Sequence, residues 1–191
     1  SEEDTVLIPG DISWAMRLED AAADLAAIDE LPGRKVLCKG NHDYWWNSIS
    51  RVRSLLPPGM TALQFSAADL GEAVVCGTRG WMFPTAETAL GEQDEKICRR
   101  EAERLRLALE DGRKKAAGRP LVAMLHYPPL TQRDQSSKMT ELMEENKVDI
   151  CIYGHLHGRA HAKIFEGNVS GGCVKYLCVS GDYRKFEPVK L

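Results

Sequence analysis

The sequence lacks a long apolar run, a C-x-x-C pair and an excess of positive charge. No segment approaches the roughly 20 apolar residues of a membrane-spanning helix, and no charged-then-apolar leader opens the chain, so we expect a soluble protein that does not act on membranes. Lys and Arg number 25 against 28 Asp and Glu, a formal net charge of −3. This balance argues against duplex nucleic acid as a partner, because phosphate backbones select strongly basic faces.

The six cysteines show neither the pairing nor the density of a disulfide scaffold. Four of them lie inside apolar, strand-like runs, where a reduced thiol behaves as a small hydrophobe: Cys38, Cys76, Cys151 and Cys178. We therefore expect a reducing compartment, most simply the cytoplasm.

A chain of 191 residues with 43% hydrophobic and 28% charged residues can bury the core of one domain, and we expect a single domain over residues 1–191. Apolar runs at 6–8, 35–38, 61–65, 73–77, 121–125, 149–153, 174–179 and 188–190 predict strands. Helical spacing predicts helices at 17–30, 47–56, 94–117 and 138–146. This alternation predicts an α/β domain whose strands are buried on both faces.

Four of the expected strands are followed at once by polar side chains. These are Asp11 after the first strand, Asn41, His42 and Asp43 after the second, His126 after the run at 121–125, and His155 and His157 after the run at 149–153. In an α/β sheet, ligands bind at the carboxyl ends of strands. Glycines at 10, 40 and 154 let the backbone turn sharply there, so we expect these side chains to converge.

A carboxylate, an amide and several imidazoles suit divalent transition metals better than Mg²⁺ or Ca²⁺, because neutral imidazole nitrogen binds Mn²⁺, Fe²⁺ or Zn²⁺. No cysteine follows a strand end, so a thiolate zinc site is not indicated. The sequence therefore predicts a site for Mn, Fe or Zn at one edge of the sheet.

Taken in order, Gly10-Asp11, Gly40-Asn41-His42-Asp43, His126 and Gly154-His155-Leu156-His157 resemble the calcineurin-like metallophosphoesterase superfamily. Within it, Gly10-Asp11-Ile12-Ser13-Trp14 resembles a bacterial branch of predicted phosphohydrolases. The resemblance implies two packed mixed β-sheets flanked by helices, a four-layer α/β/β/α sandwich. It also implies metal-dependent hydrolysis of a phosphate ester.

Two departures from the family pattern matter. The family opens with an Asp-x-His motif on a strand before the Gly-Asp turn, and this chain shows none. We expect the native protein to carry that strand upstream of residue 1. Trp14 and Asp43 also differ from the acidic residues of the phosphoprotein phosphatase form, which disfavours an activity of the calcineurin type.

The resemblance assigns metal-binding roles to five residues. Asp11 would bridge two divalent ions, Asn41, His126 and His155 would complete the second, and His157 would belong to the first. These five residues can thus supply a complete set of ligands for one ion only. Two such ions would hold a bridging hydroxide that attacks phosphorus in line.

Other residues are candidates for contact with substrate. His42 would hydrogen-bond a phosphate oxygen or protonate the leaving oxygen, and Asp43 would orient its ring, which makes both candidate catalytic residues. Arg17 and Arg79 either reach a substrate phosphate or are ordinary surface arginines. Three aromatic residues either wall the pocket or, as the pattern slightly favours, pack against the sheet: Tyr44, Trp45 and Trp46.

These observations predict a phosphoesterase acting on a small phosphomonoester or phosphodiester. The alternative is a metal-binding or interaction module on the same fold that has lost hydrolysis, because the first metal site is incomplete. A nuclease is disfavoured by the acidic balance. The physiological substrate and the oligomeric state stay open.

Overall fold

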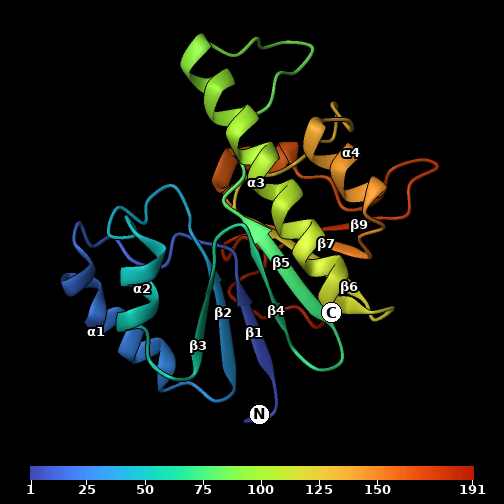
Figure 1. The fold of residues 1–191 in the computed structure, drawn as a ribbon. Helices are drawn as coiled ribbons and strands as arrows, with labels where there is room; N and C mark the ends of the chain where they lie inside the picture. The colour runs from blue at the N-terminus through green and yellow to red at the C-terminus, as the bar shows by residue number, and fades with distance from the viewer.

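The computed structural model describes residues 1–191 and contains two β-sheets packed face to face, with helices on both outer sides (Figure 1). The smaller sheet has the order β1-β2-β3, with strands β1 (Thr5–Ile8), β2 (Arg34–Cys38) and β3 (Met60–Leu63). Both of its strand pairs are parallel. The expected α/β sandwich is confirmed.

The larger sheet has six strands in the order β4-β5-β6-β7-β9-β8. Its four central strands run parallel and the edge strands β4 and β8 pair antiparallel, so this sheet is mixed. The strands are β4 (Ser66–Asp69), β5 (Val74–Thr78), β6 (Leu121–Leu125), β7 (Ile150–Tyr153), β8 (Gly167–Asn168) and β9 (Lys175–Cys178).

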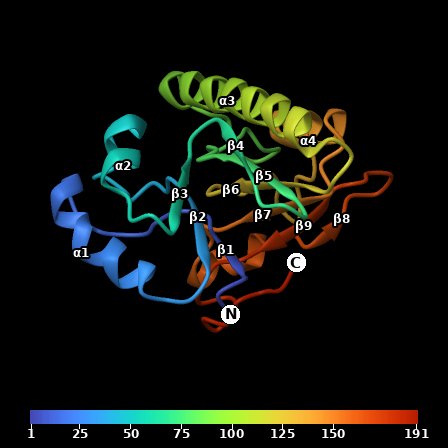
Figure 2. The same cartoon turned by 60° about the horizontal axis from the view of Figure 1, so that its bottom comes forward.

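Helices form the two outer layers (Figure 2). The helices α1 (Leu18–Asp29) and α2 (Ile49–Leu55) cover the smaller sheet, and α3 (Glu92–Ala116) and α4 (Lys138–Glu145) cover the larger one. A 3₁₀ helix follows β7 (Gly158–Lys163). None of the helices combines the length and the apolar character that crossing a membrane requires.

Three separate apolar clusters fill the three interfaces between these layers. Strand β6 shows how one strand serves two of them. Leu121 and Leu125 join the cluster beneath α3 and α4, whereas Val122 and Met124 face the smaller sheet. Successive side chains of a strand point to opposite faces, so a strand between two apolar layers needs an uninterrupted apolar run.

Some expected elements differ in the structure. The expectation of a strand at 188–190 is wrong, because this segment forms no strand. The physical reason is that Pro188 has no backbone N–H to donate to a neighbouring strand. Strands β4 and β8 were not expected. β4 consists of Ser66-Ala67-Ala68-Asp69, whose small and polar residues give no apolar alternation, and it is defined by its pairing with β5.

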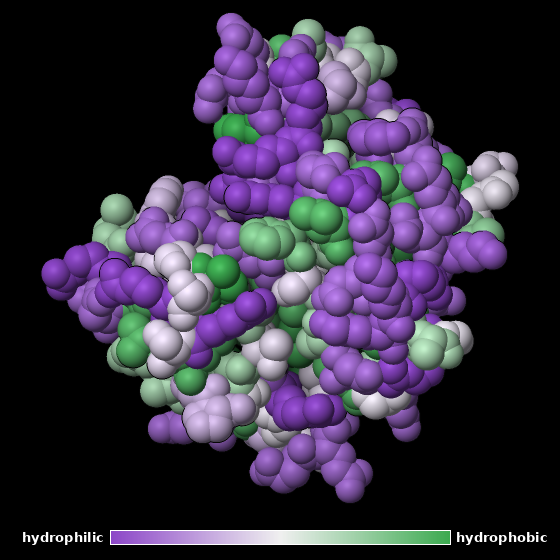
Figure 3. All heavy atoms as spheres, viewed as in Figure 1, coloured by the Kyte–Doolittle hydropathy of each residue, from purple (hydrophilic) through white to green (hydrophobic).

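The long helix α3 has one apolar and one charged side. The buried residues include Leu105 and Leu109, and the opposite side carries charged residues that make its upper part hydrophilic in Figure 3. Leu105 and Leu109 are fully buried, while Ile97 is only partly buried.

The packing of α3 supports a prediction on stability. Leu109 is fully buried and Leu107, two positions away, is 41% exposed. We expect Leu109→Ala to lower the free energy of unfolding by about 2–5 kcal/mol, because it removes buried methyl groups and leaves a cavity. Leu107→Ala, the matched control, should change it by less than about 0.5 kcal/mol. Urea unfolding measures both, and equal effects would contradict this packing.

Candidate metal centre

The ends of four strands bring the expected metal ligands together. β1 and β2 are parallel neighbours in the smaller sheet, and β6 and β7 are parallel neighbours in the larger. Asp11, Asn41, His126 and His155 follow these strands in turn. A hydrogen bond between His126 Nδ1 and the carbonyl oxygen of Pro9, 2.8 Å long, joins the two sheets at this edge. The four side chains therefore meet between the sheets.

Their ligating atoms lie close to one another. Asn41 Oδ1 is 2.7 Å from His126 Nε2 and 2.9 Å from His155 Nδ1. His126 Nε2 lies 3.2 Å from His155 Nδ1 and 3.5 Å from Asp11 Oδ2. Donor atoms that share one ion at about 2.0–2.2 Å lie about 3 Å apart. The spacing therefore fits the coordination sphere of a single transition-metal ion.

The protonation state of the two histidines also suits a metal. A carbonyl oxygen only accepts hydrogen bonds, so His126 Nδ1 donates to Pro9 and Nε2 keeps its lone pair. Burial lowers the pKa of His126, and burial together with the nearby His126 ring lowers the pKa of His155 to about 4. Both imidazoles are thus neutral near pH 7, the form that ligates metals.

The two loops that carry Asp11 and Asn41 pass very close to each other. Gly10 has φ +93° and Asp11 has φ +55°, so the chain turns through the left-handed region directly after β1. A Cβ at Gly40 would clash with the backbone nitrogen and carboxylate of Asp11. Glycine at position 40 is therefore what permits this approach.

The buried carboxylate of Asp43 holds these two loops close together. It is fully buried and accepts five hydrogen bonds of 2.7–3.1 Å. Its donors are the backbone N–H groups of Gly40, Asp11, Ile12 and Ser13 and the indole N–H of Trp45. Asp43 therefore ties the loop after β1 to the loop after β2.

The expectation that Asp43 orients the His42 ring is wrong, because backbone and indole donors occupy its oxygens. The ring of His42 instead lies 4.5 Å from the Trp14 ring between centroids, and its Nδ1 is 3.5 Å from Tyr44 Oη. The backbone N–H of His42 donates to Asp11 Oδ1 at 2.8 Å. His42 therefore adjoins the cluster, and its ring is partly exposed among aromatic side chains.

The family model described as calcineurin-like phosphoesterase matches residues 1–159. The chain belongs to this family. Its members are generally metal-dependent hydrolases of phosphate esters. A search of curated proteins found no match. β8 and β9, which lie beyond the matched range, complete the larger sheet of this calcineurin-like domain.

One expected ligand of the phosphoesterase site lies outside the cluster. His157 is exposed, and its Nδ1 lies 2.8 Å from Asp182 Oδ1. Asp182 Oδ2 accepts from the Gly158 N–H and lies 3.1 Å from His161 Nε2. The Gly158 N–H and the histidines hold the pKa of Asp182 well below its usual value. No local pattern in the sequence points to Asp182, which lies 25 residues from His157.

The other candidates of the phosphoesterase site divide between core and surface. Trp45 and Trp46 are each 1% exposed and pack in the cluster beneath α1 and α2, so the packing interpretation is confirmed for these two residues. It is wrong for Tyr44, which is exposed. Arg17 is exposed and pairs with Asp20. Arg79 is largely buried and lines a pocket beside the site.

The role of Asp43 leads to a second prediction. Asp43→Asn keeps the shape but turns one acceptor oxygen into a donor that faces N–H groups. Each buried donor left without an acceptor costs about 1–3 kcal/mol, and we expect the free energy of unfolding to fall by at least about 2 kcal/mol.

The control is Asp20→Asn, which removes an exposed ion pair with Arg17 and should cost no more than about 1 kcal/mol. Denaturant unfolding compares the two variants. Unchanged stability of Asp43→Asn would show that the carboxylate does not hold the loops together.

Proposed function

We propose that this protein is a phosphoesterase that hydrolyses a small phosphomonoester or phosphodiester with the help of Mn, Fe or Zn ions. The cluster of Asp11, Asn41, His126 and His155 at the strand ends carries the proposal. Its donors are one carboxylate, one amide oxygen and two neutral imidazoles, a set that suits these metals better than Mg²⁺.

Asp11, Asn41, His126 and His155 would hold one ion. When bound, divalent ions lower the pKa of water and offset the charge on phosphoryl oxygens. A second ion, as the family resemblance implies, would be held by the carboxylate of Asp11 and the imidazole of His157. Asp182 would then orient the His157 ring, since a carboxylate on one imidazole nitrogen fixes which nitrogen is free.

The chain itself provides a group that can move a proton. His42 follows the ligand Asn41 directly and is partly exposed, so its ring can reach a substrate bound at the cluster. In this role it would hydrogen-bond a phosphate oxygen or protonate the leaving oxygen. The exposed Trp14 ring lies beside it, tilted by 32° with the centroids 4.5 Å apart.

The alternative is a metal-binding or interaction module without hydrolysis. Its support is that His157 does not join the cluster, so that the described residues complete one ligand set only. We also keep a cytoplasmic location as part of the proposal; its support is that all six cysteines are free.

Metal binding and hydrolysis test the proposal directly. The protein is expressed from its complete reading frame, stripped with a chelator and titrated with Mn²⁺ in a calorimeter. The loaded protein is then assayed with p-nitrophenyl phosphate and bis(p-nitrophenyl) phosphate. We expect Mn²⁺ to bind and at least one ester to be cleaved, with Asp11→Asn losing at least about 100-fold in metal affinity and in kcat/KM.

The matched control, Asp20→Asn, should bind Mn²⁺ like the unchanged protein, because Asp20 pairs only with Arg17 on the surface. Metal binding without cleavage of any phosphate ester would favour the binding module. Absence of metal binding would refute the phosphoesterase and the metal-binding module, and would leave the interaction module.

A further prediction concerns His42. We expect His42→Ala to keep the metal content of the loaded protein and to lose about 100-fold or more in kcat, the usual contribution of a general acid. Elemental analysis and steady-state kinetics measure the two quantities. An unchanged kcat would remove His42 from the mechanism.

A further inference from the structure

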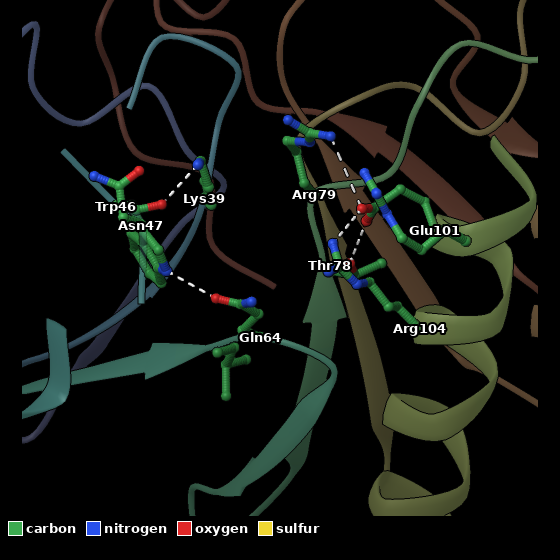
Figure 4. Close-up of a pocket in the computed structure, with 10 residues that line it drawn as sticks. Lys39, Trp46, Asn47, Gln64, Thr78, Arg79, Glu101 and Arg104 are labelled. Atoms are coloured by element: carbon green, nitrogen blue, oxygen red, sulfur yellow. Dashed lines mark hydrogen bonds and ion pairs between the residues drawn. The ribbon is translucent and has the colours of Figure 1, made fainter. Parts of the chain in front are cut away.

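A second group of polar residues lies next to the metal centre, in a pocket of about 170 Å³. Figure 4 shows Lys39 and Trp46 on one side of it, and Arg79, Glu101 and Arg104 on the opposite side. The lining includes four cations, Lys39, Arg79, Arg100 and Arg104, and one carboxylate, Glu101. The pocket is thus strongly positive in a chain whose net charge is −3.

The single carboxylate is already engaged. Glu101 is fully buried, accepts from Arg104 Nη1 at 2.6 Å and from Thr78 Oγ1 at 2.7 Å, and thereby holds Arg104 at the pocket wall. It neutralises one of the four cations. Three positive charges therefore remain in the pocket without a counter-charge among its lining residues.

The side chain of Arg79 donates no hydrogen bond within the protein. Its side chain is only 20% exposed, its nearest carboxylate oxygen is that of Glu101 at 3.9 Å, and the guanidinium lies 4.5 Å above the Trp81 ring. An ion pair of that length is beyond hydrogen-bond distance. No nitrogen of the Arg79 guanidinium is buried without a partner, so its donors remain accessible at the pocket and can bind an oxyanion of a ligand.

The pocket lies one strand away from the metal centre. The metal ligands follow β1, β2, β6 and β7, whereas the pocket is built from the residues at the ends of β2, β3 and β5 and from α3. Adjacent strands are about 5 Å apart. Lys39 precedes Asn41 by two residues, which puts their Cα atoms within about 7 Å, and the carbonyl oxygen of Arg79 accepts from the His126 N–H at 3.1 Å.

We propose that this pocket binds a phosphate group and that it holds a second, non-transferred phosphate of the substrate. This assignment rests on the proposed function, because it places the other phosphate at the metal centre. The guanidinium fork of Arg79 matches two phosphate oxygens, and Lys39 and Arg100 add charge. The volume admits several water molecules, and therefore a phosphate group. The substrate class is then a small organic bisphosphate.

The first test needs no metal and no turnover. Inorganic phosphate is titrated into the chelator-stripped, full-length protein in a calorimeter. We expect one phosphate to bind, with Arg79→Gln weakening the Kd at least 10-fold. Arg100→Gln, at an exposed position, should weaken it several-fold. Arg133→Gln is the matched control, because Arg133 is exposed and pairs with Glu87, and it should leave the Kd unchanged.

Asp11→Asn separates the pocket from the metal centre, since it removes a metal ligand and leaves the pocket intact. It should bind phosphate as tightly as the unchanged protein. If phosphate does not bind, or if Arg79→Gln and Arg100→Gln bind it normally, the site is refuted, whatever the outcome for metal-dependent hydrolysis.

The second test asks whether the phosphate belongs to the substrate. Mn²⁺-loaded protein is assayed with butyl phosphate and with 1,4-butanediol bisphosphate. We expect kcat/KM to be at least 10-fold higher for the bisphosphate, well above the two-fold statistical advantage, and Arg79→Gln to remove the preference. Equal kcat/KM values would overturn the substrate assignment and identify free phosphate as the occupant. If neither ester is cleaved, the proposed function fails while the calorimetry still decides the site.

Discussion

The carboxylate of Asp43 is the interaction on which the candidate metal centre depends. It gathers four backbone N–H groups and one indole N–H from two loops that follow neighbouring strands. Without it these donors would be buried without acceptors, and the loops that carry Asp11 and Asn41 would separate. An ionised carboxylate is well suited to this position, because it accepts hydrogen bonds in several directions and donates none.

The layered architecture explains why the ligands meet where they do. Each sheet presents the carboxyl ends of parallel strands at the same edge, and the apolar cluster between the sheets brings the two edges together. The hydrogen bond from His126 to Pro9 crosses this junction and at the same time leaves His126 Nε2 free. The same hydrogen bond therefore joins the two sheets and determines which nitrogen of His126 is free to bind a metal.

Two neighbouring regions of this edge differ in charge. The cluster around Asp11 combines one carboxylate with neutral donors, as a cation site requires, whereas the pocket around Arg79 has three cations in excess. A substrate with two phosphates would satisfy both regions at once, one through metal ions and the other through guanidinium and ammonium groups. The position of the positive pocket beside the cluster thus links the hydrolysis typical of the family to the proposed bisphosphate substrate.

The amino-acid sequence by itself determined the layered α/β class, most strands and helices, and the candidate ligands Asp11, Asn41, His126 and His155, because apolar periodicity and the residues directly after strands are local features. Only the tertiary structure decided that Asp43 holds loops rather than orienting His42, that Asp182 contacts His157, and that Arg79 and Lys39 share a pocket with α3. Some of these contacts join residues about 25 or more positions apart in the sequence. Others depend on which of several partners a side chain meets in the folded protein, and the spacing of residues along the chain does not specify that partner.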